Sequence, residues 1–388
     1  MIPRILLVVL LTSLSACGVT NKFSEYLKGD SDNAEPPAEL IEFRQRLNVI
    51  ELWSRNIGSG TDNQYLKLAP VVFNQRLYIA DADGEIEALD ATNGKKVWSI
   101  DADTRITGGP GFGENTVLVG TDEGETISFS AIDGKEQWRA TVTSEILSAP
   151  QKAHNTVIVR TGDGKVFGLS GKRGKRLWIY DRTVPSLTLR GTSTPVIDGD
   201  LVVAGFDGGK MAALDVRTGK LIWEASVATA RGRSELERMV DIDSTPLIVD
   251  GVIYIATFQG HLSAMQVETG RVLWDRDISS HAGFDADQQN IYVTGDKSHI
   301  WAFDRFTSTS LWKQEKLHLR GITAPSSIGD FIVVGDFEGY LHWMSKSSGK
   351  FVARSRLCKD PIITAPLVVG KIMYSFCSDG SLTAFSYR

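Results

Sequence analysis

Short runs of apolar and β-branched residues, separated by turn residues, follow one another along most of the chain. In the first unit of this pattern the runs are residues 71–73, 77–80, 85–89 and 97–100. Asp83-Gly84 and Asn93-Gly94 lie between them. Such pairs are typical of tight hairpins, because glycine adopts positive φ without steric penalty. Each unit is therefore predicted to form four short antiparallel strands.

The four-strand unit repeats with a fixed register. A proline near its start is followed 28 residues later by a tryptophan in five units, and Phe284 replaces the proline in a sixth. The tryptophans are Trp98, Trp138, Trp178, Trp223, Trp274 and Trp312. The prolines are Pro70, Pro110, Pro150, Pro195, Pro246, Pro325 and Pro366. Ala353 stands where a seventh tryptophan would fall. A period of roughly 40 residues with one supersecondary unit per repeat is typical of propellers and solenoids.

The eighth unit indicates how these repeats are arranged. It begins at Pro366, and the chain ends at Arg388 before a fourth strand can form. Glu51-Leu52-Trp53-Ser54 has the pattern of a fourth strand and precedes the first proline. We therefore predict an all-β, eight-bladed β-propeller over residues 49–388, closed by an N-terminal strand that leaves no long unpaired edge. A superhelical β-solenoid is the alternative.

Composition excludes several function classes. The formal net charge is -5, without the basic excess that binding to a phosphate backbone requires, so nucleic acid is not expected as a partner. The three cysteines and six histidines show no metal-ligand spacing, and no metal or cofactor is expected. Asp81-Ala82-Asp83 is interpreted as part of a turn, because the residues around it do not supply the further ligands of a calcium loop.

The N-terminus carries the features of an export signal. Arg4 precedes an apolar run from Ile5 to Leu11, and Leu14-Ser15-Ala16-Cys17 resembles the lipobox of bacterial lipoproteins. The resemblance implies cleavage after residue 16 and acylation of Cys17, and Gly18 favours delivery to the outer membrane, facing the periplasm. Several acyl chains on one residue suffice for stable anchoring. Residues 17–48 are polar and Pro-containing, so we expect a lipidated, flexible tether.

Length variation is concentrated in the connections between units. The connections from Trp178 to Pro195 and from Trp223 to Pro246 span 17 and 23 residues, against 10 to 13 elsewhere. Long loops on a rigid scaffold commonly bind partners. The first connection contains Val184-Pro185-Ser186-Leu187-Thr188-Leu189-Arg190-Gly191, with two leucines and an arginine, and the second contains residues 231–243, with arginines and carboxylates. Apolar anchors with charged neighbours fit a protein interface, although the leucines could equally cap the blades and the charges be solvated.

Two sets of residues carry a resemblance to known families. Ala213-Leu214-Asp215-Val216-Arg217-Thr218-Gly219-Lys220-Leu221-Ile222-Trp223 resembles the tryptophan-docking repeat of quinoprotein-like propellers. Together with the lipobox, the 185–191 loop and the 235–246 segment, it makes the mature chain similar to the BamB family, lipoprotein propellers of the outer-membrane β-barrel assembly machinery.

The resemblance to the BamB family implies a non-enzymatic scaffold that helps insert β-barrel proteins. It also implies that Leu187, Leu189, Arg190, Asp241 and Asp243 dock on the periplasmic POTRA domains of BamA. The alternative, independent of the resemblance, is that some of the carboxylates brace the loops internally, for example by pairing with Arg190. Unfolded β-barrel clients that add strands to blade edges are a further hypothesis.

Two functional alternatives remain beside that resemblance. A periplasmic quinoprotein enzyme would resemble this fold, but adjacent cysteines and a haem-attachment motif are missing from the sequence. A generic envelope-binding propeller would need no assembly machinery.

Two cysteines remain to be placed. Cys358 and Cys377 are expected at the same end of the propeller, where they either form a disulfide or remain two separate thiols.

Overall fold

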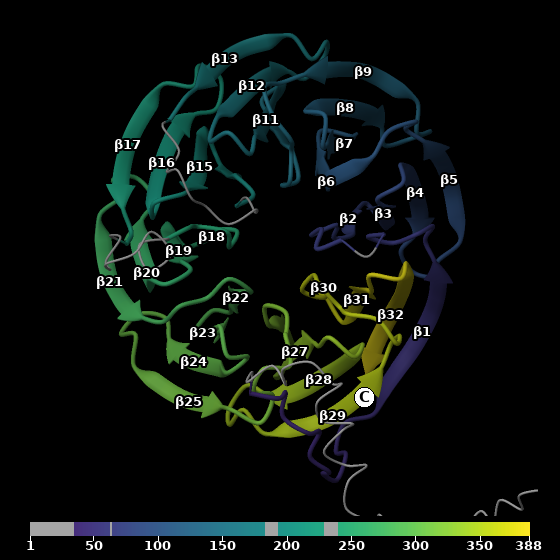
Figure 1. Cartoon of the computed structure of the whole chain (residues 1–388), viewed down its shortest axis with the longest axis vertical. Helices are drawn as coiled ribbons and strands as arrows, with labels where there is room; N and C mark the ends of the chain where they lie inside the picture. Colours follow the sequence, from purple (N-terminus) through teal and green to yellow (C-terminus); the bar gives the residue numbers. More distant parts are fainter. Residues whose placement is uncertain (1–34, 63, 183–192, 229–239) are drawn as a thin grey trace, which may run out of the picture. The chain divides into compact units, whose positions relative to one another are not determined.

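The computed structural model describes residues 35–62, 64–182, 193–228 and 240–388. The chain divides into a unit Met1–Pro36 and a unit Pro37–Arg388, and the second unit is described below. It contains eight four-stranded antiparallel sheets, the blades, arranged around a central axis (Figure 1). In the described residues no helix has the length and apolarity needed to cross a membrane. The predicted eight-bladed β-propeller is confirmed.

The blades follow one another along the chain. Blade 1 comprises β2 (Val71–Phe73), β3 (Arg76–Ala80), β4 (Glu85–Asp90) and β5 (Lys96–Asp101), and blade 2 comprises β6 (Ile106–Gly113), β7 (Thr116–Thr121), β8 (Glu125–Ser130) and β9 (Glu136–Thr141). Blade 3 comprises β10 (Gln151–Ala153), β11 (Thr156–Arg160), β12 (Val166–Ser170) and β13 (Arg176–Tyr180), and blade 4 comprises β14 (Val196–Asp198), β15 (Leu201–Phe206), β16 (Lys210–Asp215) and β17 (Leu221–Ser226). Blade 5 comprises β18 (Leu247–Val249), β19 (Val252–Ala256), β20 (His261–Gln266) and β21 (Val272–Asp277), and blade 6 comprises β22 (Gly283–Ala286), β23 (Asn290–Thr294), β24 (Ile300–Asp304) and β25 (Ser310–Gln314). Blade 7 comprises β26 (Ser326–Ile328), β27 (Phe331–Gly335), β28 (Tyr340–Ser345) and β29 (Phe351–Arg356), and blade 8 comprises β30 (Leu367–Val369), β31 (Ile372–Phe376), β32 (Ser381–Tyr387) and β1 (Val49–Asn56).

The ring is closed by pairing between the two ends of the propeller sequence. Strand β1 pairs antiparallel with β32, with Val49 opposite Tyr387 and Asn56 opposite Ser381. The N-terminal strand thereby becomes the fourth strand of blade 8, which Figure 1 shows beside β32. Closure confirms the strand assignment made for residues 51–54 and removes the open solenoid alternative.

Each fourth-strand tryptophan docks on the following blade. Its indole Nε1–H donates to a backbone carbonyl at the turn between that blade's third and fourth strands, and Trp53 donates to Ala91 over 3.1 Å in this way. The other pairs are Trp98–Ala131, Trp138–Gly171, Trp178–Val216, Trp223–Val267, Trp274–Arg305 and Trp312–Lys346. A glycine of positive φ supports the ring, and a Cβ on Gly94 would lie 2.7 Å from Trp53. The repeated tryptophan and glycine therefore form one inter-blade contact.

The missing tryptophan of blade 7 follows from the ring closure. The neighbouring blade 8 has no turn between its third and fourth strands, because β32 and β1 come from opposite ends of the propeller sequence. In place of a turn, the backbones of Asn48 and Arg388 hydrogen-bond to each other at 3.0 and 3.2 Å. Ala353 lies opposite Trp343, which is completely buried and lies against Tyr387. A tryptophan at position 353 would thus have no turn on which to dock.

Part of the expected tether is folded against blade 7. Arg320 Nη1 donates to the carbonyl of Ala38 at 3.1 Å, and Arg354 Nη1 donates to that of Ile41 at 3.0 Å. Phe43 stacks on Phe351 with ring centroids 5.5 Å apart. The described residues 37–48 are therefore held along blade 7, which differs from the flexible tether expected through residue 48. The physical reason is that blade 7 provides guanidinium donors and an aromatic face for this segment.

Candidate functional site

Both long connections begin and end at the same end of the propeller, because each runs from the fourth strand of one blade to the first strand of the next. Among the described residues, connections that lead into a blade hydrogen-bond to turns between second and third strands, as Phe258 N does to Asp241 O at 3.0 Å. Leu187, Leu189 and Arg190 lie outside the described residues. The structure does describe Asp241 and Asp243, at the end of the second long connection. The described part of the candidate site is therefore its base.

Both aspartates are buried. The exposed fraction is 1% for Asp241 and 8% for Asp243. Asp241 Oδ1 accepts the N–H of Gly208, at 3.3 Å, from the turn in blade 4. Asp241 thus links the connection before blade 5 to blade 4. In this conformation neither side chain is available as a broad contact surface, which favours the bracing role considered from the sequence.

A buried arginine lies among these carboxylates. Arg160 ends strand β11, is 1% exposed, and approaches Asp207 with Nη2–Oδ1 at 3.5 Å. Its guanidinium lies over the ring of Phe206, 5.3 Å from the centroid. It also interacts electrostatically with Asp241 and Asp243. Opposite charges thereby join blades 3, 4 and 5 at the end of the propeller where the two long connections begin and end.

Sequence reasoning missed Arg160, although the repeat contains a signal for it. The position ten residues after the start of each unit is mostly small, and Arg160 is the one charged residue there. The equivalent residues are Ala80, Gly120, Gly205, Ala256, Thr294, Gly335 and Phe376. A charged side chain at a position that faces the protein interior requires a partner nearby. The break in the repeat was therefore the available clue.

Burial shifts the ionisation of this cluster. Loss of water raises the pKa of Asp243 to about 6, with Lys67 and Arg160 opposing the shift and the neighbouring carboxylates adding to it. Burial also raises the pKa of Asp207, against the effect of Arg160. A carboxylate cluster is tolerated here because two cations lie close enough to compensate.

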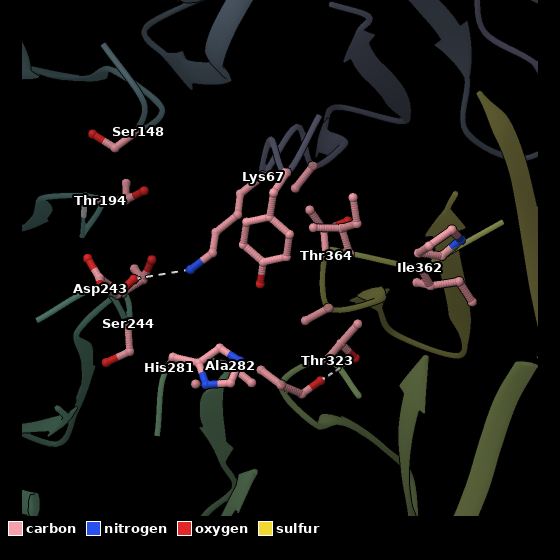
Figure 2. A pocket seen from close by; sticks show the side chains of 18 of the residues that line it. Lys67, Ser148, Thr194, Asp243, Ser244, His281, Ala282, Thr323, Ile362 and Thr364 are labelled. Atoms are coloured by element: carbon pink, nitrogen blue, oxygen red, sulfur yellow. Dashed lines mark hydrogen bonds between the residues drawn. The ribbon is translucent and has the colours of Figure 1, made fainter. Parts of the chain in front are cut away.

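The same end of the propeller contains a cavity on the central axis. Its volume is about 710 Å³, and its lining includes Lys67, Asp243, His281 and Ile362 (Figure 2). Lys67 comes from the connection before blade 1, and its Nζ donates to the backbone oxygen of Asp243, at 3.3 Å. The cavity and the base of the second long connection therefore share a residue. Sequence reasoning had not singled out Lys67.

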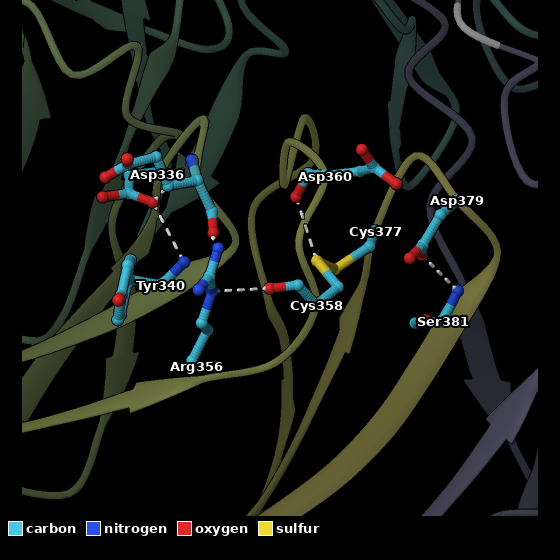
Figure 3. The surroundings of a disulfide bond; sticks show 9 residues. Asp336, Tyr340, Arg356, Cys358, Asp360, Cys377, Asp379 and Ser381 are labelled. Atoms are coloured by element: carbon cyan, nitrogen blue, oxygen red, sulfur yellow. Dashed lines mark hydrogen bonds between the residues drawn. A yellow bond between two sulfur atoms is a disulfide. The ribbon is translucent and has the colours of Figure 1, made fainter.

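Cys358 and Cys377 are joined in the structure by a disulfide, with sulfur atoms 1.99 Å apart (Figure 3). Cys358 lies in the connection leading into blade 8 and Cys377 directly follows β31, so the bond ties a connection to a neighbouring turn. Asp379 lies near both sulfur atoms. Sulfurs bonded to each other provide no thiolate for a metal ion.

Asp81 stabilises a turn. Its Oδ1 accepts the N–H groups of Gly84 and Glu85, at 2.9 and 2.8 Å, and its Oδ2 accepts that of Ser59, at 3.0 Å. These three backbone N–H donors explain why a carboxylate occupies this position in the turn.

Comparison with known proteins identifies the family. The family model described as "Outer membrane protein assembly factor BamB" matches residues 82–314. The chain belongs to the BamB family. It is 49% identical over 363 residues to the outer membrane protein assembly factor BamB of Pseudomonas aeruginosa, covering 93% of this chain and 96% of that protein. The crystal structure of BamB from Moraxella catarrhalis matches with a TM-score of 0.79 and 28% identity, covering 87% of this chain and all of that one.

Membership of the BamB family also bears on the enzyme alternative. The quinohemoprotein alcohol dehydrogenase of Comamonas testosteroni matches with a TM-score of 0.67 at 14% identity, covering 87% of this chain and 76% of that one. At that identity the match shows a common propeller fold only. The BamB family consists of non-enzymatic assembly factors, so the quinoprotein-enzyme alternative is not supported.

Proposed function

We propose that this protein is a scaffold of the outer-membrane protein assembly machinery that docks on the periplasmic POTRA domains of BamA. Its family membership supports the assembly role. Docking is assigned to the end of the propeller that carries the two long connections. In this proposal the protein is held at the periplasmic face of the outer membrane through acylated Cys17.

The buried charge cluster carries the docking part of the proposal. Arg160, Asp207, Asp241 and Asp243 join blades 3, 4 and 5 directly at the base of the connections. A rigid base lowers the entropy lost when a loop binds, because fewer conformations must be given up. Asp241 and Asp243 then act as positioning residues, and Leu187, Leu189 and Arg190 make the contact with BamA.

The docking proposal can be tested in cells by photocrosslinking. A photoreactive residue at position 187 is expected to crosslink to BamA. Matched probes at Lys95 and Lys135, in the turns between third and fourth strands, lie at the opposite end of blades 1 and 2 and are expected to give no BamA crosslink. Crosslinks to BamA from the control positions alone would refute the assignment of the docking end.

A second test separates contact from positioning. Leu187→Ala combined with Arg190→Ala is expected to abolish co-purification with BamA while the melting temperature stays unchanged, because side chains that only contact a partner do not stabilise the free protein. Asp241→Ala is expected to reduce both co-purification and the melting temperature, since it removes one of the carboxylates that compensate the buried charge of Arg160. If the double loop variant still co-purifies with BamA at the wild-type level, the docking proposal fails.

A further inference from the structure

One position of the repeat contributes side chains to the cavity on the central axis. It lies three residues before the proline, or Phe284, that starts each unit. Charged or titratable side chains occupy it in three blades: Lys67 before blade 1, Asp243 before blade 5 and His281 before blade 6. Elsewhere among the described residues it is Thr107, Leu147, Ile322 and Ile363. The pseudo-symmetric ring is therefore polarised by a few side chains, all three of which line the cavity.

The side chain of Lys67 reaches across the cavity. Blades 1 and 5 are opposite each other in a ring of eight, and the Nζ of Lys67 reaches the backbone oxygen of Asp243 at 3.3 Å. Figure 2 shows the lysine side chain extended across the opening toward Asp243. An ammonium has three N–H donors, and this is the one hydrogen bond of Lys67 to the part of the chain that the structure describes. Within the described ranges, two donors therefore remain for a ligand.

The charge of Lys67 is not fully neutralised within the cavity. Its hydrogen-bond partner is a main-chain oxygen, and over the described ranges no carboxylate oxygen lies within 4.0 Å of its Nζ. The surrounding protein lowers the pKa of Lys67 through burial, with the charge of Asp243 opposing that effect. The Lys67 side chain is exposed, so its ammonium is accessible to an anionic partner in the cavity, and a hydrogen bond between charged groups is stronger than one between neutral groups.

The cavity wall defines what such a ligand would look like. Tyr65, Phe284 and Ile362 provide apolar surface, and Tyr65 is 64% exposed. The wall thus offers apolar contact beside the ammonium of Lys67, a combination typical of small-ligand sites of 300–1,000 Å³.

We propose that this axial cavity binds a carboxylate carried on a small apolar body, with the ammonium of Lys67 as its anchor. A singly charged carboxylate is favoured over a phosphate, because Asp243 lies beside Lys67 and repels additional negative charge. The cavity volume of about 710 Å³ accommodates a body up to the size of a short peptide. The carboxylate can come from the C-terminus of a polypeptide or from a free organic acid.

Isothermal titration calorimetry on the purified full-length protein distinguishes these sources. The probes are the peptide acetyl-Ala-Ala-Leu with a free carboxyl group, the same peptide with a C-terminal amide, and isovalerate. The free acid is expected to bind at least about tenfold more tightly than the amide, the size of one charge-assisted hydrogen bond. Isovalerate binding as tightly as the peptide acid would identify a free organic acid as the ligand, and tighter peptide binding would identify a chain terminus.

Matched variants test the anchor. Lys67→Met is expected to reduce the affinity for the peptide acid to that for the amide, whereas Lys371→Met, which removes an exposed lysine before β31, leaves it unchanged. A measurement on the wild-type protein makes the test independent of variant folding: carbodiimide should couple the peptide carboxyl to Lys67, mapped by mass spectrometry. The proposal is overturned by equal binding of acid and amide, by no binding of either, or by coupling to lysines other than Lys67.

Discussion

The inter-blade contact between Trp53 and Gly94 gives the sharpest test of ring closure. Gly94 has a φ of +68°, and a Cβ there would lie 2.7 Å from the indole ring. Gly370 has a similar φ of +62°, but nothing lies within 4 Å of its would-be Cβ. The two glycines therefore share the backbone penalty for alanine and differ in the steric one.

The magnitudes follow from that difference. Alanine at either position is expected to lose about 1 kcal/mol of unfolding free energy, from its left-handed backbone alone. At Gly94 the indole ring must also shift, which adds about 1–3 kcal/mol for overpacking. We therefore expect Gly94→Ala to lose about 2–4 kcal/mol in total.

Urea unfolding followed by tryptophan fluorescence measures both values, using the midpoint shift and a common slope. In a Trp53→Leu background the penalty of Gly94→Ala should fall to that of Gly370→Ala, because the ring it collides with is gone. If Gly94→Ala is no more destabilising than Gly370→Ala in the wild-type background, Trp53 does not dock on blade 1. The closure of the ring by residues 49–56 would then be wrong.

Three further predictions concern stability. The pKa of Asp243 in the folded state is raised to about 6, so the protonated side chain stabilises the fold at low pH and this stabilisation is lost as the pH rises through 6. Between pH 4 and pH 7 the unfolding free energy of the wild type should therefore fall by up to about 3 kcal/mol relative to that of Asp243→Asn, measured by urea unfolding at each pH. Replacing Cys358 and Cys377 by serine should lower the unfolding free energy by about 2–4 kcal/mol, because the disulfide closes a loop with a sequence separation of 19. Unchanged stability of this variant, with no mass increase when the wild type is reduced and alkylated, would show that no disulfide forms. Ser308 has a φ of +57° and occupies the position at which other blades have the glycine that supports the tryptophan ring. Ser308→Gly should therefore raise the unfolding free energy by about 0.5–1 kcal/mol. A decrease in the thermal melting temperature would contradict this.

The candidate site could be predicted only in part. The lengths of two connections indicated one end of the propeller, and both connections lead into blades at that end. The burial of Asp241 and Asp243 could not be predicted, because it depends on Arg160, which is contributed by another blade. Loop composition alone made these aspartates equally compatible with contact and with bracing. Leu187, Leu189 and Arg190 remain a sequence-based prediction.

The sequence by itself determined the architecture. Hairpin turn residues, a constant spacing and one early fourth-strand pattern predicted eight blades and their closure, because β-hairpins are local and each repeat packs mainly on its neighbours. Even the missing tryptophan at Ala353 is a consequence of that closure, since blade 8 lacks the turn on which it would dock.

The tertiary structure alone decided which distant residues meet. Lys67 and Asp243 are 176 residues apart and touch across the axis, and residues 37–48 lie along blade 7. A repeat pattern records the surroundings of each position within its own blade. It carries no information about which blades face each other across the axis. That arrangement exists only once the ring closes, because it is fixed by the number and curvature of all the blades together.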